Sequence, residues 1–300
     1  KNATVLPAEK AKFFQDLTKD PKHDREKAKL LYKYLQQNFR YVSIQLGIGG
    51  LRAFPATFTD EKKYGDCKGL STYMQAALAA VGIKSHQALI NAGYNEEAVD
   101  PAFPSDPFDH VILCVPMAKD TIWLECTSKT TDFAVLGNFT ENRNALLITE
   151  NGGVLVATPK SKYKDNVFSA YTTIDVGESG SGKSTSVITS IGEYKEQVMH
   201  YLFEQNEDDK KDFIVNYLGY KQPDAFAVSK KEETDGFKAA IEMQIEKVPQ
   251  FVAGSKMFFS PRIYKLLSAK LPKSEGRKLD FYFRHPFEKS DTTQINLPAG

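Results

Sequence analysis

The fold of the first half of the chain is decided by Tyr64-Gly65-Asp66-Cys67-Lys68-Gly69-Leu70. Asp66 is a helix N-cap candidate, because its carboxylate can accept the free backbone amides of a first helical turn. Apolar residues then recur at helical spacing: Leu70, Met74, Ala77, Leu78 and Val81. Gly82 is a suitable C′ residue. The stretch therefore predicts a buried helix with Cys67 in its first turn.

The predicted position of Cys67 bears on its chemistry. The partial positive charge at a helix N-terminus favours a thiolate, which is one requirement for a nucleophilic cysteine. A single buried cysteine is more often a structural residue of a core. Both interpretations stay open until the rest of the chain is considered.

A β-hairpin further along the chain supplies two more polar groups. Residues 108–115 and 121–127 have the apolar, β-branched character of strands, and residues 116–120 form the turn. If the turn is centred there, paired residues have numbers that sum to about 237, so that Cys114 faces Trp123 and Ile112 faces Glu125. His110 and Glu125 are then diagonal neighbours on one face, whereas a slip of one residue would separate them. The same register puts Cys114 and Cys126 on opposite faces, which predicts no disulfide between them.

A helix-start cysteine, a strand histidine and a strand carboxylate are the groups of a thiol acyl-transfer site. The thiolate of Cys67 would attack an amide or ester carbonyl, and the imidazole of His110 would move the proton to the leaving group. The carboxylate of Glu125 would fix the tautomer of the imidazole. Backbone amides at the helix start would help to hold the oxyanion.

With these three motifs, at residues 65–68, 108–111 and 123–127, the chain resembles the transglutaminase-like superfamily, a papain-like group. The resemblance covers residues 20–150 and is strongest to the domains of large bacterial cell-envelope proteins. It implies that Cys67 is the nucleophile, His110 the general base and Glu125 the third member of a triad.

The resemblance also implies an oxyanion-hole side chain upstream of the nucleophile, for which Gln45 is the candidate. Asp66 and Trp123 would line the site, Trp123 as packing beneath it. The superfamily usually has Asp where this chain has Glu125, and the extra methylene puts activity in question more than fold. The alternative is therefore a catalytically inactive module that binds peptides or acts as a scaffold in a larger envelope protein.

The function that the resemblance implies is acyl transfer on amide bonds, as a peptidase, amidase or cross-linking enzyme that needs no metal or cofactor. Its expected location is the periplasm or cell envelope. The chain opens on Lys1 without a signal peptide, and we expect a mature form or a fragment. Substrate, acyl acceptor and oligomeric state are not predicted.

Composition also bears on whether the chain binds nucleic acid or spans a membrane. The chain has 300 residues and a net charge of +1, with 39 basic and 38 acidic side chains. This balance gives no electrostatic reason to expect nucleic-acid binding. No apolar run reaches the roughly 18 residues that a membrane span needs.

Two domains are expected, an α+β papain-like domain in residues 1–150 and a mainly β domain of unknown role in residues 151–300. In the first, helices are expected at residues 24–39 and, as an alternative to irregular chain, 7–17. In the second, one helix is expected at residues 207–218. Alternating segments there predict strands at residues 169–176, 185–191, 237–247 and 278–283.

One segment matches the P-loop pattern letter for letter, Gly177-Glu178-Ser179-Gly180-Ser181-Gly182-Lys183-Ser184. A P-loop needs a buried strand before it and a helix that opens at the lysine. Here the segments on both sides alternate and are rich in β-branched residues, which predicts a hairpin with a Gly/Ser turn. An ATP-binding domain built on this segment remains as a rival hypothesis.

Overall fold

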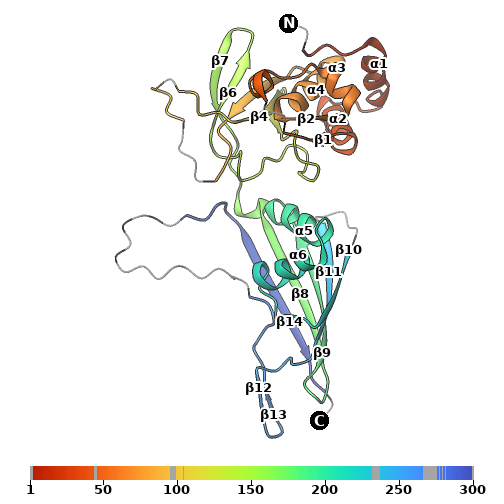
Figure 1. Cartoon of the computed structure of the whole chain (residues 1–300), viewed down its shortest axis with the longest axis vertical. Coiled ribbons are helices and arrows are strands. Elements are labelled where there is room, and N and C mark those ends of the chain that lie inside the picture. The colour runs from red at the N-terminus through yellow and green to blue at the C-terminus, as the bar shows by residue number, and fades with distance from the viewer. Residues whose placement is uncertain are drawn as a thin grey trace. The chain divides into compact units, whose positions relative to one another are not determined.

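The structure is a computed structural model, and it describes residues 3–43, 46–94, 99–103, 105–231, 237–265, 276, 278, 280 and 282–298. The chain divides into two compact units, residues 1–160 and 161–300 (Figure 1). Each unit is described here by itself. The boundary expected after residue 150 falls in the turn of a hairpin that belongs to the first unit.

Unit 1 consists of helices packed on an antiparallel sheet. The helices are α1 (Ala8–Leu17), α2 (Asp24–Asn38), α3 (Ala56–Lys62) and α4 (Cys67–Ala80). The sheet has the order β5-β4-β3-β6-β7, formed by β3 (His86–Ile90), β4 (His110–Pro116), β5 (Thr121–Leu124), β6 (Asn144–Thr149) and β7 (Gly152–Ala157). A short parallel pair, β1 (Arg40–Tyr41) and β2 (Tyr64–Gly65), lies just before α4.

Helix α4 begins and ends as its sequence predicts. Asp66 is the N-cap, and its Oδ1 accepts the Gly69 amide at 2.8 Å. Gly82 follows the helix with a φ of +80°, the left-handed conformation expected at C′. The helix is buried almost all round because it packs against α1, α2, α3 and the sheet.

The sheet of unit 1 carries a core on each face. Leu113, Val115, Ile122 and Leu124 pack with the helices, and Cys126 joins that core. Ile112, Cys114 and Trp123 pack in the other core, with Leu136. The predicted pairing of Cys114 with Trp123 is confirmed, and all three cysteines are free thiols. Cys114 and Cys126 therefore lie in different cores, as the register predicts.

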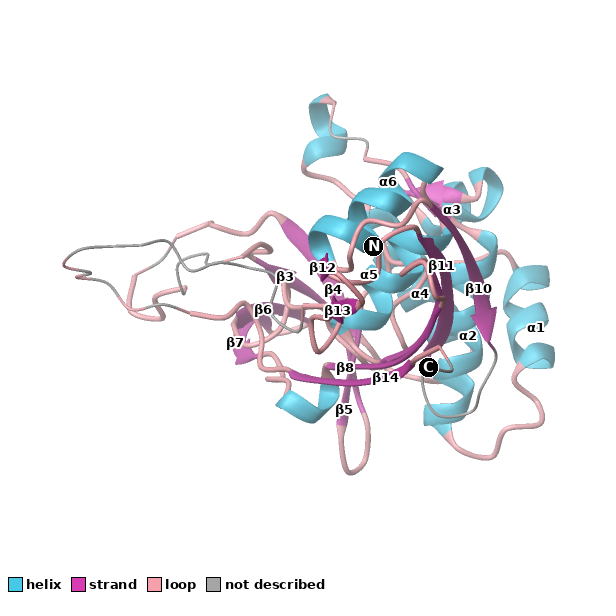
Figure 2. Cartoon of the chain, turned by 90° about the horizontal axis from the view of Figure 1, so that it is seen from below, coloured by secondary structure: helices cyan, strands magenta, loops and turns pink. Residues whose placement is uncertain are grey.

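Unit 2 is a second sheet, in the order β10-β11-β9-β8-β14, whose strands curve strongly (Figure 2). Its strands are β8 (Val167–Val176), β9 (Gly182–Ser190), β10 (Ala225–Lys231), β11 (Phe237–Ile245) and β14 (Glu288–Asn296). Helix α5 (Glu193–Phe203) contacts β8 and β9, and α6 (Glu207–Asp212) continues into a π-helical turn, Phe213–Tyr217. A small hairpin pairs β12 (Phe251–Ala253) with β13 (Lys256–Phe258).

In unit 2 one helix was missed and one expected strand is wrong. Helix α5 was not predicted, although Tyr194, Val198 and Leu202 form its buried stripe. The strand expected at residues 278–283 is wrong, because the described residues of that segment are not in a strand; 279 and 281 lie outside the described residues. The edge of the sheet is filled instead by β14, which pairs in parallel with β8.

None of the helices in the described ranges combines the length and the apolar character that crossing a membrane requires.

The packing of α4 makes a testable prediction about stability. Leu78 is fully buried in the core between α4 and the sheet. Truncation to Ala leaves a cavity, so Leu78→Ala should lower the free energy of unfolding of unit 1 by about 2–5 kcal/mol. The single tryptophan, Trp123, lies in unit 1, so its fluorescence during urea unfolding reports this unit alone. Val154→Ala, at a half-exposed position, is the control and should change the free energy of unfolding of unit 1 little. An equal effect of both substitutions would contradict the packing described.

Candidate active site

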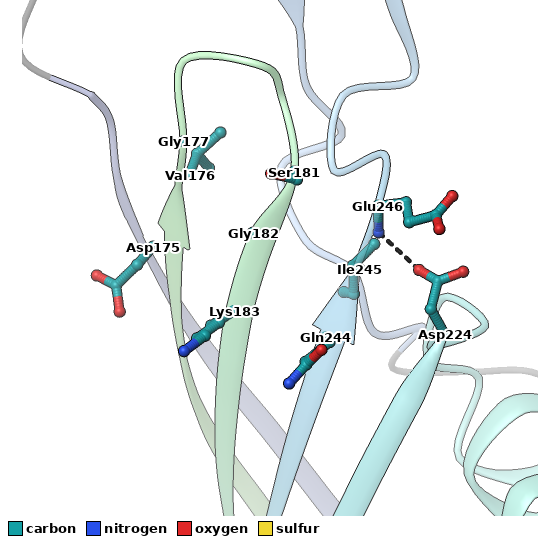
Figure 3. Close-up of a pocket in the computed structure, with 10 residues that line it drawn as sticks. All are labelled: Asp175, Val176, Gly177, Ser181, Gly182, Lys183, Asp224, Gln244, Ile245 and Glu246. Atoms are coloured by element: carbon teal, nitrogen blue, oxygen red, sulfur yellow. Dashed lines mark hydrogen bonds between the residues drawn. The ribbon is translucent and has the colours of Figure 1, made fainter.

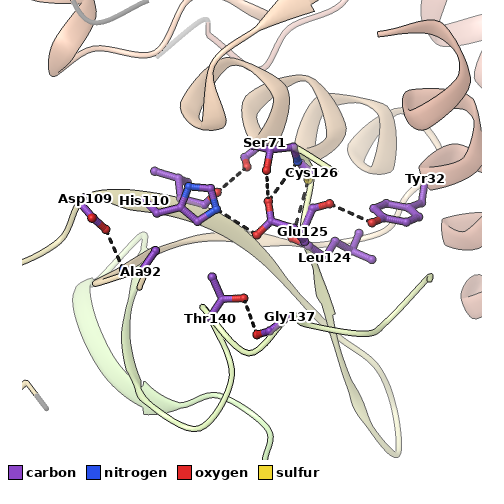
Figure 4. A network of polar contacts seen from close by, with 12 residues as sticks. Tyr32, Ser71, Ala92, Asp109, His110, Leu124, Glu125, Cys126, Gly137 and Thr140 are labelled. Atoms are coloured by element: carbon purple, nitrogen blue, oxygen red, sulfur yellow. Dashed lines mark hydrogen bonds and ion pairs between the residues drawn. The ribbon is translucent and has the colours of Figure 1, made fainter. Parts of the chain in front are cut away.

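The site is built around a hydrogen bond between His110 and Glu125. His110 opens β4, and Glu125 follows directly after β5. The ladder ends with the Leu113–Leu124 pair, so Glu125 is free of the sheet and its side chain reaches diagonally to the histidine. His110 Nε2 and Glu125 Oε2 are 3.0 Å apart (Figure 4). The predicted diagonal contact is confirmed.

Cys67 completes the arrangement from the first turn of α4. It is a nearly buried free thiol, 3% exposed. Since Nε2 of His110 faces Glu125, Nδ1 is the nitrogen left for the thiol. Burial alone would lower the pKa of His110, but hydrogen bonds with Cys67 and Glu125 outweigh it and raise the pKa to about 10. The imidazolium is therefore the favoured form of His110 at neutral pH.

Glu125 is fully buried, and both of its carboxylate oxygens and its backbone carbonyl have hydrogen-bond partners. Its Oε1 accepts the amide of Thr127 at 3.1 Å and also the Thr127 hydroxyl. Its carbonyl accepts the hydroxyl of Tyr32 from α2 at 2.9 Å. Both carboxylate oxygens thus take part in hydrogen bonds. Glu125 lies just beyond the end of β5, and its side chain, one methylene longer than that of Asp, reaches His110 from there.

A second set of contacts ties α4 to the strands at the site. The Ser71 hydroxyl donates to the carbonyl of Val111 at 3.2 Å, next to His110 (Figure 4). Cys126 is buried and its thiol points to the carbonyl of Leu124. Burial raises the pKa of the Cys126 thiol, and burial raises that of Cys114 to about 11. Of the three cysteines, only Cys67 shares a hydrogen bond with the histidine.

The segment on the other side of His110 is fixed by Arg143. Its guanidinium donates to four backbone carbonyls, those of Asn91, Gly93, Asn138 and Glu141, at 2.6–3.2 Å. The loop so held places the Phe139 ring 6.0 Å from the His110 ring. Asp109 adds a further tie, because its Oδ1 accepts the Ala92 amide at 2.8 Å.

The remaining predicted site residues have mixed outcomes. Asp66 is buried; it caps α4 and its Oδ2 pairs with the ammonium group of Lys68 at 2.5 Å. Trp123 packs in the core with Ile112 and Cys114. Gln45 lies outside the described residues, so the structure gives no position for it.

Sequence reasoning missed Tyr32, Thr127 and Arg143. Thr127 could have been found, because a hydroxyl two residues after a carboxylate often bonds it locally. Tyr32 extends the apolar stripe of α2, but its partner lies 93 residues away. The partners of Arg143 are backbone carbonyls, which leave no side-chain signal in a sequence.

The P-loop-like segment is the turn between β8 and β9, as the alternating flanks predict. Lys183 lies on β9 and pairs with Asp175 of β8, and no helix follows it (Figure 3). Gly180 has a φ of +83°, and a Cβ on Gly182 would lie 2.7 Å from the Asp175 carbonyl oxygen. These two glycines are therefore required by the hairpin.

The pocket beside this turn has the wrong charge for a nucleotide. Its volume is about 520 Å³, and its charged lining residues are Asp175, Lys183, Asp224 and Glu246. Three carboxylates against one ammonium repel a polyphosphate.

Because this segment is a hairpin turn, Lys183→Ala should not change the behaviour of the protein towards nucleotides. We expect isothermal titration with MgATP to give no binding heat for either the wild type or the variant, since no backbone cradle for phosphate is present. A binding isotherm in the wild type that disappears in the variant would contradict the hairpin interpretation.

The raised pKa of His110 makes stability depend on pH with a definite sign. The ordinary histidine pKa is 6.5, so the stabilisation by the imidazolium is complete below pH 6.5 and is lost as the pH rises to about 10. The free energy of unfolding of unit 1 should fall over this range by up to about 1.4 kcal/mol per pH unit. Urea unfolding followed by Trp123 fluorescence from pH 6 to 10 measures it. His110→Gln should flatten the curve; parallel curves for both proteins would exclude the raised pKa.

Part of this chain is similar to a known protein family. Residues 11–127 match the model of the transglutaminase-like superfamily. No curated protein matches the sequence significantly. A proposed protease from Parabacteroides distasonis is similar in structure with a TM-score of 0.41 and 11% identity, over 81% of this chain and 50% of that one. A proposed cysteine protease from Cytophaga hutchinsonii is similar with a TM-score of 0.32 and 16% identity, over 51% and 45%.

This chain thus spans about half the length of both structures. The family match covers the helix that carries Cys67 and the hairpin that carries His110 and Glu125, and it is independent of the distances between them. Over residues 11–127, less than half of its length, this chain is therefore similar to the transglutaminase-like superfamily.

Proposed function

We propose that unit 1 catalyses thiol-dependent acyl transfer on amide bonds, with Cys67, His110 and Glu125 as a catalytic triad. The observation that carries the proposal is the 3.0 Å hydrogen bond between His110 Nε2 and Glu125 Oε2, with Cys67 hydrogen-bonded to the same imidazole. A buried carboxylate that orients an imidazole beside a thiol is the arrangement that such catalysis needs.

The proposed reaction has two stages. In the first, the Cys67 thiolate attacks the carbonyl carbon, the C–N bond breaks, and the imidazolium of His110 gives its proton to the leaving amine. In the second, His110 takes a proton from water, the resulting hydroxide attacks the thioester, and the C–S bond breaks to release acid and thiolate. Water is the simplest acceptor, and an amine in its place would give cross-linking.

The first turn of α4 supplies a place for the oxyanion. Capping by Asp66 uses the amides of Gly69 and Leu70. The amides of Cys67 and Lys68 lie outside the bonding pattern of the helix, since the first four N–H groups of a helix have no partner within it. We assign the amide of Cys67 as an oxyanion donor.

The substrate is proposed to be a peptide or another amide, and the location to be the periplasm or cell envelope; both rest on the sequence resemblance. An inactive peptide-binding module is the second candidate. It is favoured by one observation, the 3% exposure of Cys67, because a nucleophile must be reached by its substrate.

The pH dependence of Cys67 alkylation by iodoacetamide, located by peptide mass spectrometry, decides between the candidates. In the wild type we expect Cys67 to be alkylated faster than in His110→Ala, because an imidazolium beside the sulfur favours the nucleophilic thiolate. His110→Ala should slow alkylation at pH 6 by at least about tenfold and give the profile of a free thiol, whose pKa is about 8.5. Glu125→Ala should have a smaller effect in the same direction.

The chain offers two internal controls. Cys114 and Cys126, whose pKa values are raised by burial, should stay unlabelled over this range. Glu125→Asp tests whether the shorter carboxylate still reaches His110. If Cys67 is inert, or reacts identically in the wild type and in His110→Ala, the triad is not functional and the binding-module candidate takes its place.

A further inference from the structure

Unit 2 has a pocket of its own, which takes no part in the chemistry proposed for unit 1. Its volume is about 650 Å³. Pockets of roughly 300–1,000 Å³ are typical of small-molecule sites in proteins. The lining comes from the last residues of β8 and β14 and from residues 215–221, 248–250 and 259–265.

The part of the pocket that adjoins the sheet is apolar. Ile174 of β8 and Ile295 of β14 are register partners in the parallel pair, so their side chains share one face of the sheet. Val248 and Phe259 add to the same lining, and all four belong to the core of unit 2 or pack against it. A hydrocarbon chain is the kind of group that such a lining binds.

Two segments of the lining are held together by backbone hydrogen bonds. The Lys221 amide donates to the Ile263 carbonyl at 2.7 Å, and the Lys265 amide donates to the Gly219 carbonyl at 3.1 Å. These bonds fix the chain at 263–265 against the chain that follows the π-helical turn. The positions of the side chains carried by both segments are therefore set by main-chain contacts.

The charged residues of the lining are all basic: Lys221, Arg262 and Lys265. The ammonium group of Lys221 donates to the backbone carbonyls at 247–248. Arg262 Nη1 lies 3.7 Å from Oδ2 of Asp291, which is not itself a lining residue. In the described ranges no carboxylate pairs with Lys265. Three cations without a lining carboxylate favour an anionic ligand.

The lining also includes a buried hydroxyl that lacks a partner. Tyr264 is 1% exposed, and its hydroxyl has no hydrogen-bond partner within the part of the chain that the structure describes. A buried polar group is costly when it is left unpaired, so a ligand atom that accepts this hydrogen bond would be stabilised in the pocket.

We propose that this pocket binds an aliphatic carboxylate. The hydrocarbon chain lies against Ile174 and Ile295, and the carboxylate lies at Arg262 and Lys265, where the planar guanidinium offers paired donors. A fatty acid and the C-terminus of a peptide that ends in apolar residues share this chemistry. The proposal concerns unit 2 alone and is independent of the function proposed for unit 1.

Isothermal titration of the full chain with three probes tests the charge preference and the source. The probes are decanoate, N-acetyl-Leu-Leu with a free carboxylate, and decyltrimethylammonium, each below the concentration at which it forms micelles. We expect at least one carboxylate to bind about tenfold or more tightly than the cation, because only an anion bonds with the basic side chains. The carboxylate that binds more tightly identifies the source. If neither binds more tightly than the cation, the proposal is overturned.

Three variants locate the binding in this pocket. Lys265→Glu reverses the charge of an exposed side chain, Arg262→Gln removes the guanidinium, and Tyr264→Phe removes the unpaired hydroxyl. The first two should weaken binding of the preferred carboxylate by at least about tenfold, and the third should weaken it less. Unchanged binding in Lys265→Glu and Arg262→Gln overturns the proposal.

The matched control is Lys231→Glu, which makes the same change of net charge at an exposed lysine of β10 outside the pocket. Binding by this variant should equal that of the wild type, and an equal loss in Lys231→Glu and Lys265→Glu overturns the proposal. Thermal unfolding followed by circular dichroism checks that each variant is folded. If Arg262→Gln is unfolded because Asp291 has lost its partner, Lys265→Glu alone decides.

Discussion

The buried carboxylate of Glu125 is the constraint on which unit 1 depends. A fully buried charge is costly unless hydrogen bonds and an opposite charge replace the water it has lost. Here one oxygen faces the His110 imidazole and the other accepts two hydrogen bonds from Thr127. These partners are available only in one register of β4 and β5, since a slip of one residue would turn His110 to the opposite face.

The same constraint extends to the helices. Tyr32 of α2 donates to the carbonyl of Glu125, and Gln36, one turn later, donates to the carbonyls of Ser128 and Thr131. Helix α2 therefore fixes the chain that follows β5, while Ser71 of α4 is bonded beside His110. Since the two helices pack against each other, the distance between Cys67 and the hairpin is set by the core rather than by a loop.

Patterns that are local in sequence gave the parts of this site that could be predicted. The Asp66 cap, the stripe of α4 and the Cys114–Trp123 pairing each depend on residues near one another, so spacing alone reveals them. Tyr32 and Arg143 could not be identified in this way, because hydrogen bonds to distant backbone carbonyls place no requirement on neighbouring side chains. In unit 2, strand β14 was missed for a related reason. Its partner β8 lies more than a hundred residues earlier, and its own residues alternate between exposed and partly buried positions, so that no buried apolar face marks it in the sequence.

The two glycine-rich segments show why composition alone does not define a site. The segment at 177–184 matches a phosphate-binding pattern, yet its glycines allow two strands to approach closely and its pocket carries three carboxylates. The segment Gly47–Gly50 matches no such pattern, yet it presents exposed apolar side chains from a loop tied to the strand before Cys67. A glycine-rich segment takes its role from the elements that flank it, and the strands on both sides of residues 177–184 make that segment a turn.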